Sequence, residues 1–118
     1  MDGFFDWLDE VLEREFPAGV KGICFILYED GDYHWSVELV GAERFDVKDD
    51  DWPCYEVFAT REDPYCFYKE VEYEDIEQEV GEVLKKYLQE GKYAQKLKEY
   101  EGVGFCFDDG DLFNIYQR

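Results

Sequence analysis

Apolar and polar residues alternate with two different periods along the chain, and the change of period separates helices from strands. The first segment, FFDWLDEVLEREF (residues 4–16), has apolar side chains at helical spacing on one face: Phe4, Leu8, Val11 and Leu12. Asp2 is available as an N-cap, and Pro17 marks the end of the segment. The pattern predicts an amphipathic helix near the N-terminus.

Three strands are predicted after this helix. The stretch ICFILYEDGDYHWSVELV (residues 23–40) has an apolar run, then a turn rich in Asp and Gly, and then alternating apolar and polar side chains. This order is typical of a β-hairpin. CYEVFAT (residues 54–60) alternates in the same way and predicts a third strand. The pattern does not assign the link between Arg61 and Tyr73.

The second half of the chain starts with another helical pattern. From Glu74 onward, with Gly91 as the expected C-cap, an apolar stripe comprises Ile76, Val80, Val83, Leu84, Tyr87 and Leu88. A shorter helix carrying Tyr93, Leu97 and Tyr100 is predicted next. VGFCFDDGDLFNIY (residues 103–116) then has the order of strand, Asp-Gly turn and strand, which predicts a second hairpin.

The predicted order of elements is α-β-β-β-α-α-β-β. It requires no parallel crossover, so we expect an antiparallel sheet of about five strands with helices packed on one face. A chain of 118 residues has the size of one ordinary domain. We therefore predict the α+β class and a single domain spanning residues 1–118.

The charge of the chain excludes several classes of partner. There are 31 acidic and 12 basic residues, which gives a formal net charge of −19. Nucleic acids and anionic membranes bind basic surfaces, so we expect no direct binding to either. The 19% aromatic content is too high for a disordered acidic chain. The N-terminus lacks a basic start and an uninterrupted apolar run, so we expect no signal peptide and a cytoplasmic location.

The four cysteines lack the spacing of a metal site or a redox pair. Cys24, Cys54, Cys66 and Cys106 form no C-x-x-C motif. In a cytoplasmic protein without these motifs we expect buried, free thiols.

The acidic stretch DVKDDDW (residues 46–52) raises the possibility of a calcium site, but its spacing disagrees with an EF-hand. A loop that starts at Asp46 has Asp51 at the glycine position and Val57 at the position of the bidentate glutamate. DDGD (residues 108–111) is better explained as a tight hairpin turn. We expect no metal site and no cofactor.

Nucleophilic catalysis has few candidate residues. His34 is the only histidine and Ser36 the only serine. They lie two residues apart on the same face of a predicted strand, where side chains stand roughly 7 Å apart, too far for a nucleophile and its base. The many carboxylates disfavour a reactive thiolate. We expect a non-enzymatic protein without catalytic residues.

Charge and aromatic residues are concentrated in one segment. Residues 46–82 contain 14 acidic and 3 basic side chains, and the aromatic residues in this segment include those at positions 52, 55, 65, 67, 68 and 73. Aromatic anchors among charged residues are typical of protein-binding surfaces, although a solvated face that confers solubility has the same charge. Trp52 also suits a core position. The predicted partner-binding residues are Asp46, Asp49, Asp50, Asp51, Trp52, Glu62, Asp63, Tyr65, Glu70, Glu72, Tyr73 and Asp75.

Three stretches carry a resemblance to a known group of proteins: ILYEDGDYHWSVELVGAERFD, DWPCYEVFATRE and KYLQEGKYAQKLKEYEGVGFCFDDGDLFNIY. The chain resembles small acidic bacterial immunity proteins of polymorphic toxin and contact-dependent inhibition systems. The resemblance implies a cytoplasmic inhibitor that binds a toxin domain, often a basic nuclease, and blocks its active site or its nucleic-acid surface.

Charge and resemblance together predict a binding protein for a basic protein partner, most simply a toxin domain. The alternative is an inhibitor or regulatory module that mimics nucleic acid and occupies a DNA- or RNA-binding protein. A small hydrolase is the third alternative.

Overall fold

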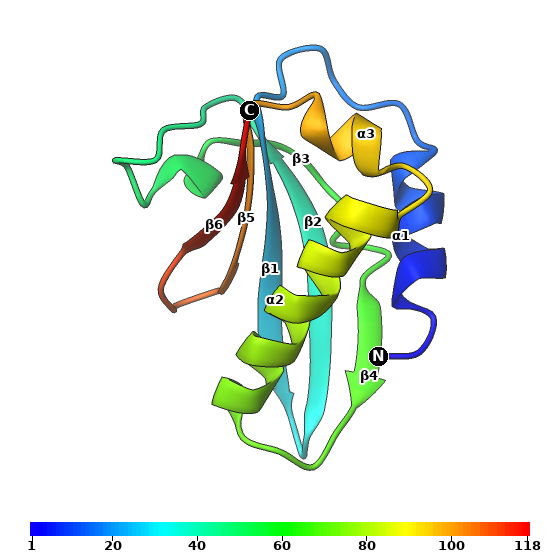
Figure 1. The fold of residues 1–118 in the computed structure, drawn as a ribbon. Helices are drawn as coiled ribbons and strands as arrows, with labels where there is room; N and C mark the ends of the chain where they lie inside the picture. Colours follow the sequence, from blue (N-terminus) through cyan, green and yellow to red (C-terminus); the bar gives the residue numbers. More distant parts are fainter.

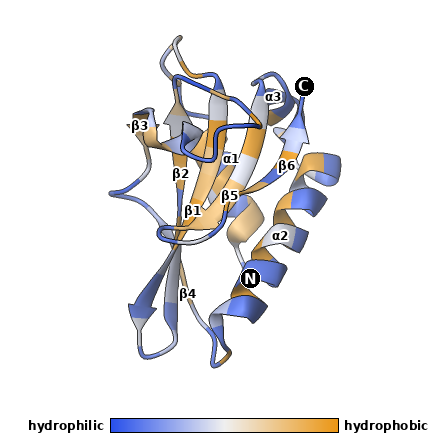
Figure 2. Ribbon diagram, turned by 90° about the vertical axis from the view of Figure 1, so that its left-hand side faces the viewer, coloured by the Kyte–Doolittle hydropathy of each residue, from blue (hydrophilic) through white to orange (hydrophobic).

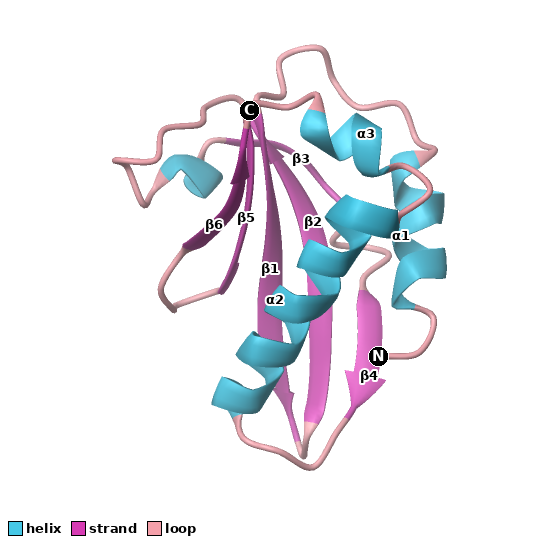
Figure 3. Cartoon of the chain, in the orientation of Figure 1, coloured by secondary structure: helices cyan, strands magenta, loops and turns pink.

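One six-stranded sheet and three α-helices make up the computed structural model, which describes residues 1–118 (Figure 1). The three α-helices lie on one face of the sheet (Figure 3). The elements in chain order are α1 (Phe4–Leu12), β1 (Gly22–Gly31), β2 (His34–Ala42), the 3-10 helix η1 (Trp52–Cys54), β3 (Glu56–Ala59), β4 (Tyr65–Tyr68), α2 (Tyr73–Glu90), α3 (Ala94–Lys98), β5 (Gly102–Phe107) and β6 (Phe113–Gln117).

The α+β class is confirmed, but the sheet is mixed where an antiparallel sheet was expected. Its strand order is β3-β2-β1-β5-β6, and β4 also pairs with β2. Every pair is antiparallel except β1 with β5, which runs parallel from Gly22↔Gly102 to Leu27↔Phe107. The cause is α2, which returns the chain to the end of the sheet where β1 begins (Figure 1). The next strand, β5, then has to run in the direction of β1.

The main core lies between the helices and one face of the sheet. Side chains of successive strand residues point to opposite faces, so the odd-numbered residues of β1, β2 and β5 share this face. The strands contribute buried Ile23, Phe25, Leu27, Trp35, Val37, Leu39, Tyr65, Val103, Phe105 and Phe107. The helices contribute Phe4, Leu8, Val11, Leu12, Ile76, Val80, Leu84, Tyr87, Leu88 and Leu97. The apolar faces predicted for both long helices are therefore confirmed, and the outer side of α2 is hydrophilic (Figure 2).

A second, smaller core lies on the opposite face of the sheet. Trp52 is fully buried there against Cys24 and Ala42. Two glycines make room for the aromatic rings, because a Cβ atom at Gly22 would lie 2.7 Å from the Trp52 ring and one at Gly102 would lie 2.1 Å from the Phe45 ring. Trp52 is thus a core residue, and the prediction that it anchors a partner is wrong, because its indole is inaccessible.

Two local predictions also need correction. The N-cap of α1 is Gly3, at φ 77°, and it makes no side-chain cap. Asp2, the predicted cap, instead accepts a hydrogen bond at its backbone carbonyl from the Tyr65 hydroxyl, 2.7 Å away. The link from Arg61 to Tyr73 contains β4, a four-residue strand that is too short for a clear pattern.

The helices carry no membrane-spanning segment. The longest, α2, has 18 residues and many charged side chains, and no helix combines the length and hydropathy that a span requires.

Replacing Trp52 with alanine tests the second core. Because the indole is fully buried, Trp52→Ala should lower the free energy of unfolding by about 3–5 kcal/mol, as measured by urea denaturation. Tyr55→Ala is the control, since Tyr55 is 46% exposed and its removal should change the free energy of unfolding by about 1 kcal/mol or less. Equal losses in the two variants would contradict the assignment of Trp52 to a core.

Candidate functional site: an acidic groove

The face of the sheet opposite the helices is hollowed beside the second core. One hollow has a volume of about 690 Å³, and a second, of about 770 Å³, continues it toward the outer end of β1. The two share Tyr28, Phe107, Asp108, Gly110 and Asp111 as lining residues. We call them together the acidic groove. Apolar side chains of Ile26, Val40 and Leu112 line the part next to Trp52.

The charge of the acidic groove is almost entirely negative. Its only cationic lining residue is Arg61. Its ten acidic lining residues come from five separate parts of the chain and are Glu29, Asp30, Glu38, Asp50, Asp51, Glu56, Glu77, Asp108, Asp109 and Asp111. A concave surface lined by one sign of charge concentrates the electric potential and attracts ions of the opposite sign.

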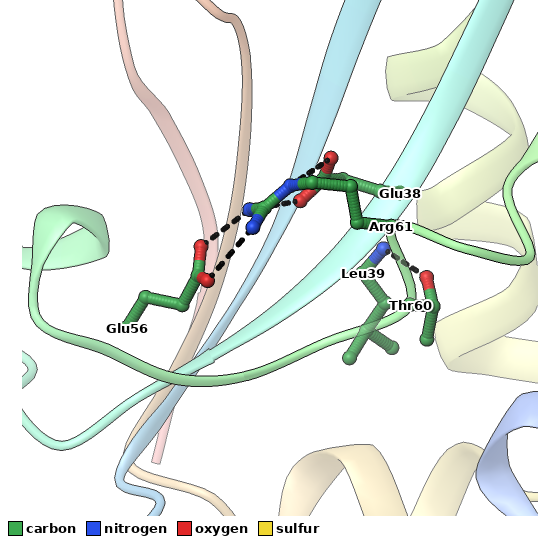
Figure 4. Close-up of polar contacts among 5 residues, drawn as sticks. All are labelled: Glu38, Leu39, Glu56, Thr60 and Arg61. Carbon is green, nitrogen blue, oxygen red and sulfur yellow. Dashed lines mark hydrogen bonds and ion pairs between the residues drawn. The ribbon is translucent and has the colours of Figure 1, made fainter.

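Arg61 is held between two carboxylates (Figure 4). Its Nη2 donates to Glu38 Oε1 at 2.8 Å and to Glu56 Oε1 at 2.6 Å. Its Nε and Nη1 complete the two bidentate pairs, with Glu38 Oε2 at 3.3 Å and Glu56 Oε2 at 3.2 Å. These two carboxylates raise the pKa of the Arg61 guanidinium above its ordinary value. The Glu38 side chain is 3% exposed, so Arg61 neutralises a carboxylate that would otherwise be buried without a counter-charge.

The position of Arg61 follows from an interruption in the edge strand beside β2. Strands β3 and β4 pair with β2 one after the other, and Thr60 fills the gap between them. The Thr60 amide donates to the Leu39 carbonyl at 3.0 Å, and its Oγ1 accepts from the Leu39 amide at 2.9 Å (Figure 4). The chain then leaves the sheet in a turn at residues 61–64, which brings Arg61 over Glu38.

Tyr28 and Glu77 are among the groove-lining groups whose pKa values are shifted by their surroundings. Burial, reinforced by the carboxylate of Glu38, raises the pKa of Tyr28 to about 12. Burial, followed by the negative charges of Asp111 and Glu74, raises the pKa of Glu77. Both shifts favour the form with less negative charge. Burial is the larger cause of both shifts, and neighbouring carboxylates add to it.

The predicted partner-binding residues do not form one continuous surface. Asp50, Asp51 and Tyr73 line the acidic groove. Glu62, Asp63, Glu70, Glu72 and Asp75 are exposed but do not line it. Tyr65 is 8% exposed and belongs to the main core, which contradicts its predicted role as a contact.

Several of the predicted acidic residues have partners within the chain. Asp46 and Asp49 both pair with Arg44, at 3.8 and 3.1 Å. Each also accepts a backbone N–H two residues on, which shapes the loop before η1. Asp63 pairs with Arg14 at the end of α1, away from the acidic groove.

Sequence reasoning missed most of the acidic groove. It did not single out Tyr28, Glu38 or Glu77, and it treated DDGD (residues 108–111) as a turn only. The two DGD turns, at residues 30–32 and 109–111, were visible in the sequence as acidic turns. That they lie close together depends on the parallel pairing of β1 with β5, which brings both hairpin turns to the same end of the sheet.

His34 and Ser36 lie on β2 as expected, but in different surroundings. The exposed His34 ring packs on Tyr68, with 5.1 Å between ring centroids. Ser36 is buried, at 8% exposure. No hydrogen bond joins the two side chains.

The cysteines are free, but they are not all buried. Cys24 is buried, and burial raises the pKa of its thiol well above the ordinary value. Cys106 is half-buried, whereas Cys54 and Cys66 are exposed, contrary to prediction, because they lie on a short helix and an edge strand rather than in the central strands. No group of three or more His, Cys, Asp or Glu side chains has an arrangement that would hold a metal ion.

Comparison with protein-family models, with curated proteins and with solved structures finds no match to this chain.

The ion pair of Arg61 generates a prediction about stability. Arg61→Met leaves Glu38 buried without its counter-charge and should lower the free energy of unfolding by about 2 kcal/mol. The loss should be smaller than for breaking a fully buried ion pair, because the Arg61 side chain is 56% exposed. The matched control is Arg14→Met, which breaks the exposed pair with Asp63 and should cost about 1 kcal/mol or less. Urea denaturation measures both, and an equal loss would show that burial of Glu38 has no energetic consequence.

The raised pKa of Tyr28 generates a prediction about alkaline pH. The unfolded chain releases the tyrosine proton near pH 10, whereas the folded protein retains it up to a pKa of about 12. The contribution of Tyr28 to stability is therefore complete below pH 10 and is lost as the pH rises toward 12. Tyr28→Phe should make the fall in free energy of unfolding between pH 10 and 12 shallower, and identical slopes for the two proteins would contradict the shift.

Proposed function

We propose that this protein is a non-enzymatic binding protein whose acidic groove docks a basic protein. The observation that carries the proposal is the groove itself: ten carboxylates and one guanidinium line a hollow that runs from the sheet face opposite the main core to the first turns of α2. The guanidinium of Arg61 is already used within the fold by Glu38 and Glu56. The remaining acidic side chains are available to cations of a partner.

The physical chemistry of the acidic groove suits a protein partner. Its negative potential would accelerate the encounter with a basic surface and disfavour anionic competitors. Its apolar lining at Ile26, Val40 and Leu112 offers contact area that excludes water, which a purely ionic surface lacks. Partner cations would also offset the negative charges of Asp111 and Glu74, which add to the effect of burial in raising the pKa of Glu77.

We further propose that the partner is a toxin domain and that the protein acts as a cytoplasmic immunity protein. Two observations support this assignment: the resemblance of the chain to acidic bacterial immunity proteins, and the lack of any basic surface in the acidic groove for nucleic acid itself. A nuclease must hold phosphates in a cationic site. Carboxylates at the rim of the groove would occupy that site in place of phosphates.

Neutralising three groove carboxylates tests the proposal. The variant Asp50→Asn/Asp108→Asn/Asp111→Asn should associate more slowly with the basic toxin domain that we propose as the partner, and its association rate should depend less on salt. We expect roughly a tenfold lower association rate at low ionic strength, measured by stopped flow. Cells that produce the basic domain should lose protection in the same variant.

The matched control removes the same charge from another part of the surface. Asp6→Asn/Glu10→Gln/Glu15→Gln neutralises three exposed carboxylates on or just after α1, outside the acidic groove. This control should associate nearly as fast as the wild type. If both triple variants slow association equally, net charge alone drives binding and the groove has no special role.

A further inference from the structure

The tip of the β1–β2 hairpin has an unusual backbone for its sequence. Gly31 pairs with His34, so Asp32 and Tyr33 form a two-residue loop. Both have positive φ, at 51° and 62°, after Gly31 at 92°. Loops of this kind favour Asn-Gly, because a bulky L-residue is strained in the left-handed region. Tyr33 is therefore a poor choice for folding alone, and such strain is typical of functional positions.

The strained turn presents an aromatic surface to solvent. Tyr33 is 47% exposed and Tyr68, on the neighbouring strand β4, is 54% exposed. Between them the His34 ring packs against Tyr68. We call Tyr33, His34 and Tyr68 the aromatic tip. The tip lies at the far end of the long β1–β2 hairpin, next to the end of β4 (Figure 1).

Hydrogen bonds fix the two strands that carry the aromatic tip. The Lys69 amide donates to the Tyr33 carbonyl at 3.0 Å, and the Trp35 indole Nε1 donates to the Lys69 carbonyl at 3.0 Å. The Tyr68 hydroxyl donates to the Glu70 carboxylate. The aromatic rings are thus held on a supported backbone, which reduces the entropy lost on binding.

The charges around the aromatic tip are also negative. Asp30, Asp32 and Glu70 lie in or beside the two strand ends, and the one nearby cation, Lys69, is paired with Glu79 at 2.5 Å. Aromatic faces next to carboxylates that have no cationic partner suit a planar cation that can stack and form ion pairs at once. Arginine has these properties, whereas the compact ammonium group of lysine stacks less well.

We propose that the aromatic tip binds arginine side chains of the basic partner by stacking on Tyr33 and Tyr68. The inference rests on the proposed function and deepens it, because it names guanidinium groups as what the partner presents at this end of the molecule. Asp30 also lines the acidic groove, so the tip and the groove are adjacent parts of one negative surface. The groove supplies attraction to any cation, and the tip supplies selectivity for arginine.

Two peptides, one of nine arginines and one of nine lysines, separate the role of the aromatic tip from that of the acidic groove. Each is titrated into the protein by isothermal titration calorimetry at one fixed salt concentration. The wild type should bind the arginine peptide about fivefold more tightly than the lysine peptide, as expected for one or two exposed cation–π contacts. Tyr33→Asn/Tyr68→Leu should bring this ratio close to one while leaving the affinity for the lysine peptide unchanged. Tyr55→Leu removes an equally exposed tyrosine outside the tip and should keep the ratio.

A single substitution distinguishes function from folding. Tyr33→Asn introduces a residue that tolerates positive φ, so it should raise the melting temperature by a few degrees while lowering the arginine preference. A lower melting temperature, or an unchanged preference in a folded variant, would overturn the inference. The inference would also be overturned if the free wild-type protein were a dimer and the Tyr33→Asn/Tyr68→Leu variant a monomer, because the aromatic tip would then bind a second copy of this chain.

Failure of the inference and failure of the proposed function give different results. The groove variant Asp50→Asn/Asp108→Asn/Asp111→Asn should weaken both peptides alike and keep their ratio. If the ratio is one in the wild type but the groove variant still weakens both peptides, only the role of the tip is wrong. If the groove variant binds both peptides as tightly as the wild type, the proposed function is wrong.

Discussion

The excess of carboxylates over cations is the constraint on which this structure depends. With 31 acidic and 12 basic residues around one domain, most of the acidic side chains must remain in water without a counter-charge. The fold places the main apolar core on one face of the sheet and most of the uncompensated carboxylates elsewhere on the surface. Period-two alternation in β1 and β2 sends apolar side chains to the helices, and the opposite face holds a small core around Trp52 and the acidic groove. Arg61 provides the one internal counter-charge there, for Glu38, whose carboxylate is buried.

Much of the fold could be predicted because it follows from local periodicity. The stripes of α1 and α2, both hairpins and the α+β class are confirmed. The parallel pairing of β1 with β5 was not predictable from pattern, since alternation within a strand carries no information about its direction relative to another strand. Strand β4, in the link after Arg61, was also not predictable from pattern, because four residues are too few to define a period.

The candidate site was predictable only in part. The charge of the segment from residue 46 to 82 pointed to a basic partner, and Asp50, Asp51 and Tyr73 do line the acidic groove. Trp52 was ambiguous because an indole serves equally in a core or at an interface. The structure decides for the core, since the indole is fully buried and packs directly over Gly22. Glu38 could not be singled out among so many carboxylates, since its burial depends on Arg61 and on the gap between β3 and β4.

Hydrogen exchange of the free protein and of its complex with the basic domain it is proposed to neutralise tests the central claim most directly. If the acidic groove is the docking site, backbone amides in the loop at residues 49–55 and in the turn at residues 108–112 should exchange more slowly in the complex, while those in α1 should be unchanged. Most residues of both segments other than Trp52 are exposed in the free protein, so their protection would be measurable. Slower exchange centred on α1 or on the outer side of α2, with the two loops unchanged, would contradict the account.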